Sequence, residues 1–395
     1  MNQIFDVNPI INAPYEKPKK YWQLDDFGKP TGVVSDGRRV SSHLVPIPAS
    51  QRKRKEQAQQ GELSLEEEAK ENPIVNLIRR QVDQWRLKPL EQQNLSYVSK
   101  KLLNHWREGK TTPRPFFCQV EAAETFIWLN EVAPNTVDGQ RILSELNDVN
   151  AEANPGLLRY AAKMATGSGK TTVIAMMIAY QTINKARQPN SSRFSNNFLI
   201  IAPGITIKDR LRVLLPSDPN SMYVGRGVVP SEFTEDIKKA RIVITNYHSF
   251  LKREKVKMSK NAREILKGNN ETEISTLETE GEMLERACKD LLRSKDVIVI
   301  NDEAHHCYRH KTLSDEDKVT SEEKEEIKKN DEAARLWISG IEALGKKVGL
   351  KCVYDLSATP FFLRGSGYPE GQLFPWVTSD FNLMDAIECG IVKLP

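Results

Sequence analysis

The sequence has few cysteines and no long apolar run, and each scarcity excludes a class of protein. Five cysteines are spread over 395 residues, and none belongs to a Cys-x-x-Cys pair. That argues against a disulfide scaffold, thiol redox chemistry and a zinc ribbon. No apolar stretch approaches the roughly 18 residues of a membrane-spanning helix, and the N-terminus lacks the apolar core of a secretory signal. We therefore expect a cytoplasmic protein with no membrane partner.

An excess of one charge is also missing. The 57 Lys and Arg residues and the 53 Asp and Glu residues leave a formal net charge of +4, which is too balanced to indicate a nucleic-acid partner by itself. Hydrophobic residues make up 39% and charged residues 28% of the chain, so folded structure is expected. At roughly 100–200 residues per domain, the length predicts two or three domains.

Two N-terminal regions are expected to precede the main domain. Residues 1–61 are expected to form an extended arm because six prolines interrupt any long regular element: Pro9, Pro14, Pro18, Pro30, Pro46 and Pro48. Residues 62–112 are expected to be helical, with a helix starting at Asn72-Pro73. Two apolar stripes there have the helical period, namely Ile74, Ile78, Val82 and Trp85, then Leu95, Val98, Leu102 and Trp106.

Residues 113–390 have the pattern of a parallel α/β domain, because short apolar runs alternate with helical patterns. The expected strands are Arg159–Met164, Phe198–Ala202, Arg241–Thr245, Asp296–Ile300 and Cys352–Leu356. Loops with unusual chemistry follow these runs, at the edge of the sheet where ligand sites are expected.

Two charged stretches are expected to be insertions in this domain, at about 251–294 and 308–332. Charged stretches of this kind usually form solvated surface or loops. The alternative is that the basic half of the first insertion, Lys252–Lys267, contacts phosphate.

The strongest chemical signal is the sequence MATGSGKT at residues 164–171, between a strand pattern and a helical run. This context is typical of a phosphate-binding loop, in which Gly167 and Gly169 let backbone N–H groups point inward and the helix N-terminus adds positive potential. Lys170 is placed to reach the β- and γ-phosphates, and the Thr171 hydroxyl to bind Mg²⁺. Met164 stands where the simple motif has its first glycine.

A second signal is a hydrophobic strand pattern that ends in two carboxylates, Asp302 and Glu303. Asp302 is placed to hold the Mg²⁺ shell, and Glu303 to orient or deprotonate a water. Because side chains alternate along a strand, the two are expected to point to different sides and to take separate roles.

Histidines and a cysteine follow these carboxylates and invite a metal-site interpretation: His305, His306, Cys307 and His310. We reject it because adjacent ligands suit tetrahedral zinc poorly. The better role for His305 is a polar link from the nucleotide site to its surroundings. Small hydroxyl residues in the segment 355–360, sequence DLSATP, could bond to such a histidine or to nearby carboxylates.

The strings MATGSGKT, DEAH and SATP, in that order, resemble motifs I, II and III of superfamily 2 helicases and translocases. RPFFCQVEA, from Arg114, resembles their adenine-recognising Q motif, and FLIIAPG and IVITNYH resemble the segments that contact nucleic acid. Further strings are similar to the Res subunit of type III restriction enzymes, among them FDVNPIINAPYE, NDEAHHCYR and DLSATPFFLRGSGYPEG. The resemblance implies a RecA-like P-loop domain with helices on both faces of a parallel sheet.

The resemblance also implies an activity and a set of site residues. The activity is ATP-driven movement on double-stranded DNA in restriction, with ATP and Mg²⁺ as cofactors. Gln119 would read adenine, Ser357 and Thr359 would couple hydrolysis to movement, and the catalytic set would add Lys170, Asp302, Glu303 and His305. The nucleotide would be held by Ala165, Thr166, Gly167, Ser168, Gly169, Lys170, Thr171 and Thr172, together with Gln119. The metal ligands would be Thr171 and Asp302, and Pro203, Gly204, Thr245 and Asn246 would lie near the DNA backbone.

The resemblance further implies a second motor domain and a nuclease domain. It also implies association with a methyltransferase or specificity subunit. Residues 391–395 are expected to begin the linker into that second motor domain, which would follow downstream or come from another chain. Two alternatives stay open. The chain could bind ATP and DNA without turnover, or it could be a general DNA or RNA helicase outside restriction, because motifs do not separate the two nucleic acids.

Overall fold

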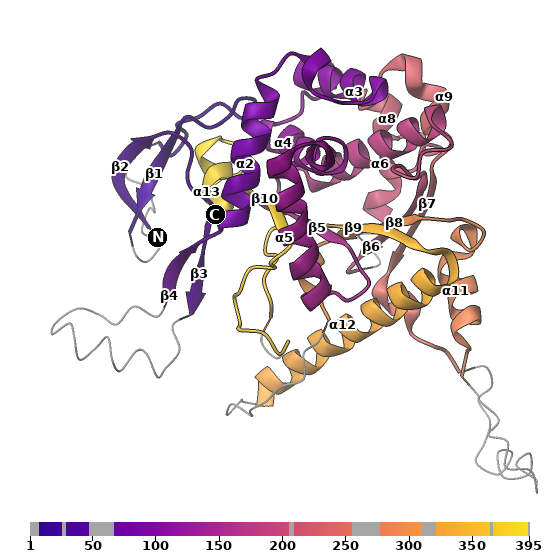
Figure 1. Cartoon of the computed structure of the whole chain (residues 1–395). Coiled ribbons are helices and arrows are strands. Elements are labelled where there is room, and N and C mark those ends of the chain that lie inside the picture. Colours follow the sequence, from indigo (N-terminus) through magenta and orange to yellow (C-terminus); the bar gives the residue numbers. More distant parts are fainter. Residues whose placement is uncertain are drawn as a thin grey trace, which may run out of the picture.

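The computed structural model describes residues 8–25, 29–46, 67–204, 209–254, 277–309, 321–363 and 366–393. Its centre is a six-stranded sheet with every neighbouring pair parallel, in the order β10-β5-β9-β8-β6-β7 (Figure 1). The strands are β5 (Arg159–Met164), β6 (Asn197–Ala202), β7 (Arg241–Asn246), β8 (Val297–Asp302), β9 (Leu350–Ser357) and β10 (Val377–Phe381). The predicted α/β parallel sheet is confirmed, and its first strand lies between the two later strands β9 and β10.

Both faces of the sheet are covered because its central strands carry apolar side chains on both sides. In β6, Phe198 and Ile200 belong to one hydrophobic cluster, whereas Leu199 and Ile201 belong to another. This alternation follows from the two-residue repeat of a strand. A strand that buries both sides needs a helical layer on each, as in doubly covered parallel sheets.

The first cluster contains residues of the helices α2 to α6, and the second contains residues of α11 and α12 (Figure 1). The longer helices are α2 (Pro73–Arg86), α3 (Tyr97–Arg107), α4 (Phe117–Ile127), α5 (Val137–Ala153), α6 (Lys170–Arg187), α11 (Glu280–Cys288) and α12 (Ser321–Val348). The shorter helices are α8 (Met222–Gly225), α9 (Thr234–Ile237) and α13 (Leu383–Glu388), and η2 (Trp128–Val132) is a π-helical segment. The 3₁₀ turns are η1 (Leu90–Gln92), η3 (Ala133–Asn135), η4 (Leu211–Leu214), η5 (Ser231–Phe233), η6 (Tyr247–Phe250), η7 (Lys289–Leu291) and η8 (Ala304–His306).

The N-terminal arm, together with the strand β4 that follows it, forms two small antiparallel pairs beside the β10 edge of the sheet (Figure 1). They are β1 (Lys20–Leu24) with β2 (Pro30–Asp36), and β3 (Ser42–Pro46) with β4 (Glu67–Glu71). The arm is tied to the domain by polar contacts: the Trp22 N–H donates to Glu388, and Arg38 forms a buried ion pair with Glu121 of α4. The arm is therefore a fixed part of this fold where it is described.

The two apolar stripes predicted from the sequence are buried except at Ile74, which is half-buried while its neighbour Val75 is buried. Ile78, Val82 and Trp85 of α2 are buried, as are Val98, Leu102 and Trp106 around α3. The helix α2 begins at Pro73, as the Asn72-Pro73 signal indicates.

Several elements differ from the sequence prediction. The strand β4 lies inside the range expected to be helical, β10 had no counterpart among the expected strands, and both expected insertions contain ordered helix. Met283, Leu284 and Cys288 of α11 are buried in the second cluster, so this part of the first stretch is core rather than solvated loop. Within the second stretch, α12 already begins at Ser321. Residues 255–276 and 310–320 lie outside the described residues, and with them most of the basic half, Lys252–Lys267.

A buried charge joins three strands beneath the sheet edge. The Arg159 guanidinium is fully buried and forms an ion pair of 2.8 Å with Asp355. It also lies 4.8 Å from the centre of the Trp337 ring and 4.3 Å from that of Trp376. Asp355 also accepts hydrogen bonds from Asn301 of β8 and from the Trp376 indole. A charge out of water needs such partners, and here they lock β5, β8 and β9 together.

Candidate nucleotide-binding site

The loop between β5 and α6 has the shape that the glycine pattern predicts. Gly167 and Gly169 have positive φ angles of 84° and 86°, a region that favours glycine. A Cβ on Gly169 would lie 2.1 Å from the Gln119 amide nitrogen, so any side chain there would displace Gln119. The helix α6 begins at Lys170 and directs its free N–H groups and positive dipole end toward this loop.

This loop faces a cavity of about 510 Å³. Its lining brings together residues from the two strongest sequence signals: Thr166, Gly167, Gly169, Lys170, Thr171 and Thr172 from the loop and helix, and Asp302 and Glu303 from the end of β8. The remaining lining residues come from the segment after β6, namely Arg210, Leu211, Val213, Met222 and Arg226.

The prediction that the two carboxylates point to different sides is wrong, because Asp302 and Glu303 line the same cavity. The strand β8 ends at Asp302, and Glu303 has a positive φ of 54° before the turn η8. Strand alternation therefore does not apply at Glu303; the left-handed backbone turns its side chain instead. Its carboxylate lies 2.8 Å from the Lys170 amine, so both residues face the same cavity.

Asp302 has the surroundings of a cation ligand. Burial raises the pKa of Asp302 above its usual value and nearby Glu303 acts in the same direction, while Lys170 and Arg210 oppose them. The Thr171 side chain belongs to the same cavity lining. A hydroxyl and a carboxylate beside a phosphate loop are the oxygen donors that Mg²⁺ takes alongside nucleotide phosphates, so the donor set fits this ion.

His305 connects the end of β8 to the end of β9. Its Nδ1 lies 3.4 Å from the Ser357 hydroxyl and 3.7 Å from a Glu303 carboxylate oxygen. Burial lowers the pKa of His305, and nearby Glu303 opposes this shift. The Ser357 hydroxyl also accepts the Thr359 N–H at 3.2 Å, and none of His305, Ser357 and Thr359 lines the cavity.

Other predicted residues lie farther from the cavity. Ala165 and Ser168 are buried within the loop, and Gln119 is 6% exposed and does not line the cavity. Thr245 and Asn246, expected near DNA, are buried at the end of β7, which leaves them little surface for a phosphate. His306 and Cys307 follow His305, while His310 lies outside the described residues; across the described ranges, no cluster of three or more His, Cys, Asp or Glu side chains could hold a metal.

The five lining residues after β6 carry no motif, which is why the sequence did not point to them. Leu211 begins the turn η4 and Arg210 directly precedes it, while Met222 begins the short helix α8. Only their position after a strand at the ligand edge of the sheet could have marked them.

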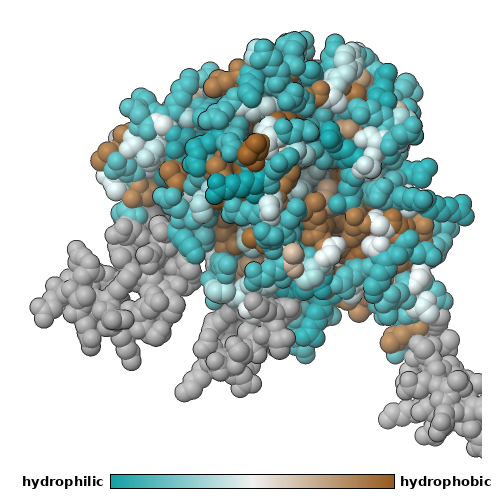
Figure 2. Space-filling view, in the orientation of Figure 1, coloured by the Kyte–Doolittle hydropathy of each residue, from teal (hydrophilic) through white to brown (hydrophobic). Residues whose placement is uncertain are grey.

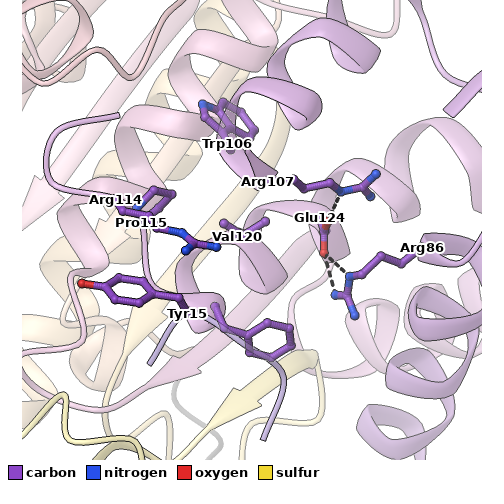
Figure 3. A pocket seen from close by; sticks show the side chains of 9 residues that line it. Tyr15, Arg86, Trp106, Arg107, Arg114, Pro115, Val120 and Glu124 are labelled. Carbon is purple, nitrogen blue, oxygen red and sulfur yellow. Dashed lines mark hydrogen bonds and ion pairs between the residues drawn. The ribbon is translucent and has the colours of Figure 1, made fainter. Parts of the chain in front are cut away.

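Helix α4 also borders a second, smaller cavity of about 110 Å³ (Figure 3). Glu124 accepts hydrogen bonds from Arg86 and Arg107, and the Arg114 guanidinium lies 5.0 Å from the centre of the Tyr15 ring. Arg114, which precedes the Q-like segment, therefore stacks on the arm rather than lining the phosphate cavity.

A six-stranded parallel sheet with a phosphate loop after one strand and paired carboxylates after another defines a P-loop domain of the superfamily 2 helicase type. The family model for the type III restriction enzyme, res subunit, matches residues 118–362. This is well over half of the chain, and the chain therefore belongs to that family. No curated protein and no solved structure matches it. None of the helices in the described ranges is long and apolar enough to cross a bilayer.

Proposed function

We propose that this chain is an ATP-dependent motor that couples hydrolysis to movement on double-stranded DNA in a type III-like restriction system. One observation carries the proposal: the phosphate-loop lysine, the Thr171 hydroxyl and both carboxylates line a single cavity. The family supports the restriction setting, and the cavity supports the ATPase.

The residues fit Mg·ATP in the roles that the motifs indicate. The loop from Ala165 to Gly169, followed by the N-terminus of α6, offers backbone N–H groups to phosphate oxygens. Thr171 and Asp302 would hold Mg²⁺, which when bound neutralises charge on the phosphates. Thr172 extends this wall of the cavity.

Lys170 and Glu303 would act in sequence. Lys170 now neutralises Glu303, and binding the phosphates would draw its amine toward their oxygens. Glu303 would then be free to orient a water and take its proton. The pair thus keeps the base occupied until the phosphates are bound.

His305 would carry the state of Glu303 to Ser357, since it lies within 4 Å of both side chains. Ser357 in turn holds the Thr359 backbone, at the start of the segment expected to couple hydrolysis to DNA movement. Pro203 and Gly204, which are half-buried after β6, would lie near the DNA backbone.

The family further implies partners for this motor. They are a methyltransferase or specificity subunit, a second motor domain that would complete the ATP cleft, and a nuclease domain. We propose all three as parts of the working assembly.

Lys170→Ala tests the proposal. Loss of a charge-assisted contact should weaken ATP binding roughly 10- to 150-fold and abolish turnover. Lys347→Ala, which changes an exposed lysine at the end of α12, should change neither. Unaltered ATP binding and turnover in Lys170→Ala would contradict the proposed function. If the wild-type chain binds ATP but releases no phosphate either with or without duplex DNA, the alternative of a binding module without turnover is favoured.

A further inference from the structure

The cavity at the phosphate loop carries more positive charge than the motifs account for. Three cations line it, Lys170, Arg210 and Arg226, beside the carboxylates Asp302 and Glu303. Lys170 is engaged by Glu303 at 2.8 Å, whereas the motifs assign no role to either arginine. Within the described part of the chain, neither guanidinium takes part in a hydrogen bond or an ion pair. Both charges are therefore available to a ligand of this cavity.

Exposure alone would not single out an arginine, because hydrophilic residues cover most of the face that Figure 2 shows. Arg210 differs from other exposed arginines by how its backbone is held. It directly precedes η4, and Leu211 and Leu214 of that turn are buried in the first hydrophobic cluster. The Leu214 carbonyl also accepts the Tyr223 hydroxyl at 2.8 Å. The turn is thus anchored to the core and holds the exposed Arg210 side chain at the cavity.

A second arginine on the same turn has a different partner. Arg212 lies two residues further on, and its Nε is 3.7 Å from a carboxylate oxygen of Asp218. Its side chain is 65% exposed, and it does not line the cavity. Of these two neighbouring arginines, one faces the cavity and the other is engaged by Asp218. Arg212 therefore serves as a matched control for Arg210.

Arg210 lies at the end of the cavity that contains the carboxylates. Burial raises the pKa of Asp302, and the positive charges of Lys170 and Arg210 oppose this shift. Because the interaction between charges weakens with distance, this places Arg210 near Asp302. Asp302 is the expected Mg²⁺ ligand, and in phosphoryl transfer the metal bridges oxygens of the β- and γ-phosphates. The terminal phosphate would therefore come to this end of the cavity.

A terminal phosphate needs a cation at this position. It would bring negative charge close to Asp302 and Glu303, and Lys170, once drawn to the phosphates, would no longer neutralise Glu303. Like charges at close range are unfavourable without a counter-charge. An arginine stays charged at any relevant pH, and its planar guanidinium can donate two parallel hydrogen bonds to phosphate oxygens. Arg210 has the charge and the place that this step requires.

We propose that Arg210 binds the terminal phosphate of the nucleotide, so that the wall after β6 distinguishes a triphosphate from a diphosphate. The proposal rests on the proposed ATPase function and deepens it, because it assigns to this chain a contact that only the triphosphate makes. After hydrolysis and release of phosphate, ADP would leave Arg210 without this partner.

Titrations of the full chain in the presence of Mg²⁺ test the proposal with two nucleotides: AMP-PNP, an ATP analogue that is not hydrolysed, and ADP. Arg210→Ala should raise the Kd for AMP-PNP roughly 10- to 150-fold, the effect of losing a hydrogen bond between charged groups. It should leave the Kd for ADP unchanged. Arg210→Lys should recover only part of the loss, because lysine keeps the charge without the planar group. Arg212→Ala should change neither Kd.

Two results would overturn the proposal. One is a Kd for AMP-PNP that Arg210→Ala leaves unchanged, and the other is an equal rise of both Kd values. Lys170→Ala separates this failure from failure of the proposed function. If Lys170→Ala raises both Kd values while Arg210→Ala raises neither, only the role of Arg210 fails. If Lys170→Ala also changes neither, the cavity is not the nucleotide site and the proposed function fails with it.

Discussion

The Lys170 amine lies 2.8 Å from a carboxylate oxygen of Glu303. The lysine comes from the first residue of α6, whereas the glutamate follows β8 in a left-handed turn. The contact therefore joins the phosphate loop directly to the expected catalytic base. Because one amine cannot neutralise Glu303 and a triphosphate equally well, phosphate binding should free Glu303.

This pair makes a prediction for Glu303→Gln. Removing the carboxylate removes both the base and the competitor for Lys170, so ATP should bind at least as tightly as to wild type. Turnover should fall by at least about 10²-fold, the usual contribution of a positioned base. Titration of ATP beside phosphate release measures both effects.

The control is Glu235→Gln, at an exposed carboxylate that pairs only with Lys238 in the described structure. It should leave binding and turnover as they are. Weaker ATP binding in Glu303→Gln would mean that the carboxylate helps to hold the nucleotide, and rapid turnover would remove it from the base role.

The link between His305 and Ser357 makes a second prediction. Ser357→Ala should keep the affinity for ATP, because Ser357 does not line the cavity. DNA-stimulated turnover in the complete assembly should fall about fivefold, the effect of one hydrogen bond. If the link runs through His305, the double variant His305→Ala/Ser357→Ala should lose less than the sum of the single losses. Additive losses would show that the two residues act separately.

The buried pair Arg159–Asp355 makes a prediction about stability. Arg159→Ala leaves a fully buried carboxylate without its counter-ion and should lower the free energy of unfolding by about 3–5 kcal/mol. Arg335→Ala, which breaks an exposed pair with Asp331, should cost under about 1 kcal/mol. Denaturant unfolding of both variants compares them, and equal small losses would mean that Asp355 is satisfied by Asn301 and Trp376 alone.

Glu388 makes a prediction about pH. Burial raises the pKa of Glu388 to about 7, although its Arg39 partner opposes the shift. A carboxyl that binds its proton more tightly in the folded state contributes stability below its ordinary pKa near 4.5 and loses that contribution as pH rises toward 7. The unfolding midpoint of wild type, measured relative to that of Glu388→Gln, should therefore decrease as the pH rises from about 4.5 to 7. Above about pH 7 the difference should stay constant. A difference that does not change with pH would contradict the shifted pKa.

The sequence predicted most of the strands and the phosphate side of the cavity because both depend on local patterns. The loop glycines need left-handed backbone, and the apolar strands need two buried faces, so neither requires knowledge of the distant chain. The strand β10 was not predicted because its sequence, VTSDF, is short and polar. It forms by pairing with β5, which lies more than two hundred residues earlier. Met222 and Arg226 were not predicted as cavity residues for the same reason, because their place at the cavity depends on how α8 packs against α6.

The central claim is that the cavity lined by Lys170, Asp302 and Glu303 hydrolyses ATP to drive a motor on DNA. The most direct measurement is the rate of phosphate release from ATP and Mg²⁺ by the assembled system, with and without duplex DNA, for wild type and Lys170→Ala. The account predicts turnover that duplex DNA stimulates in wild type and that is absent from Lys170→Ala. Turnover that ignores duplex DNA, or that survives the loss of Lys170, would contradict it.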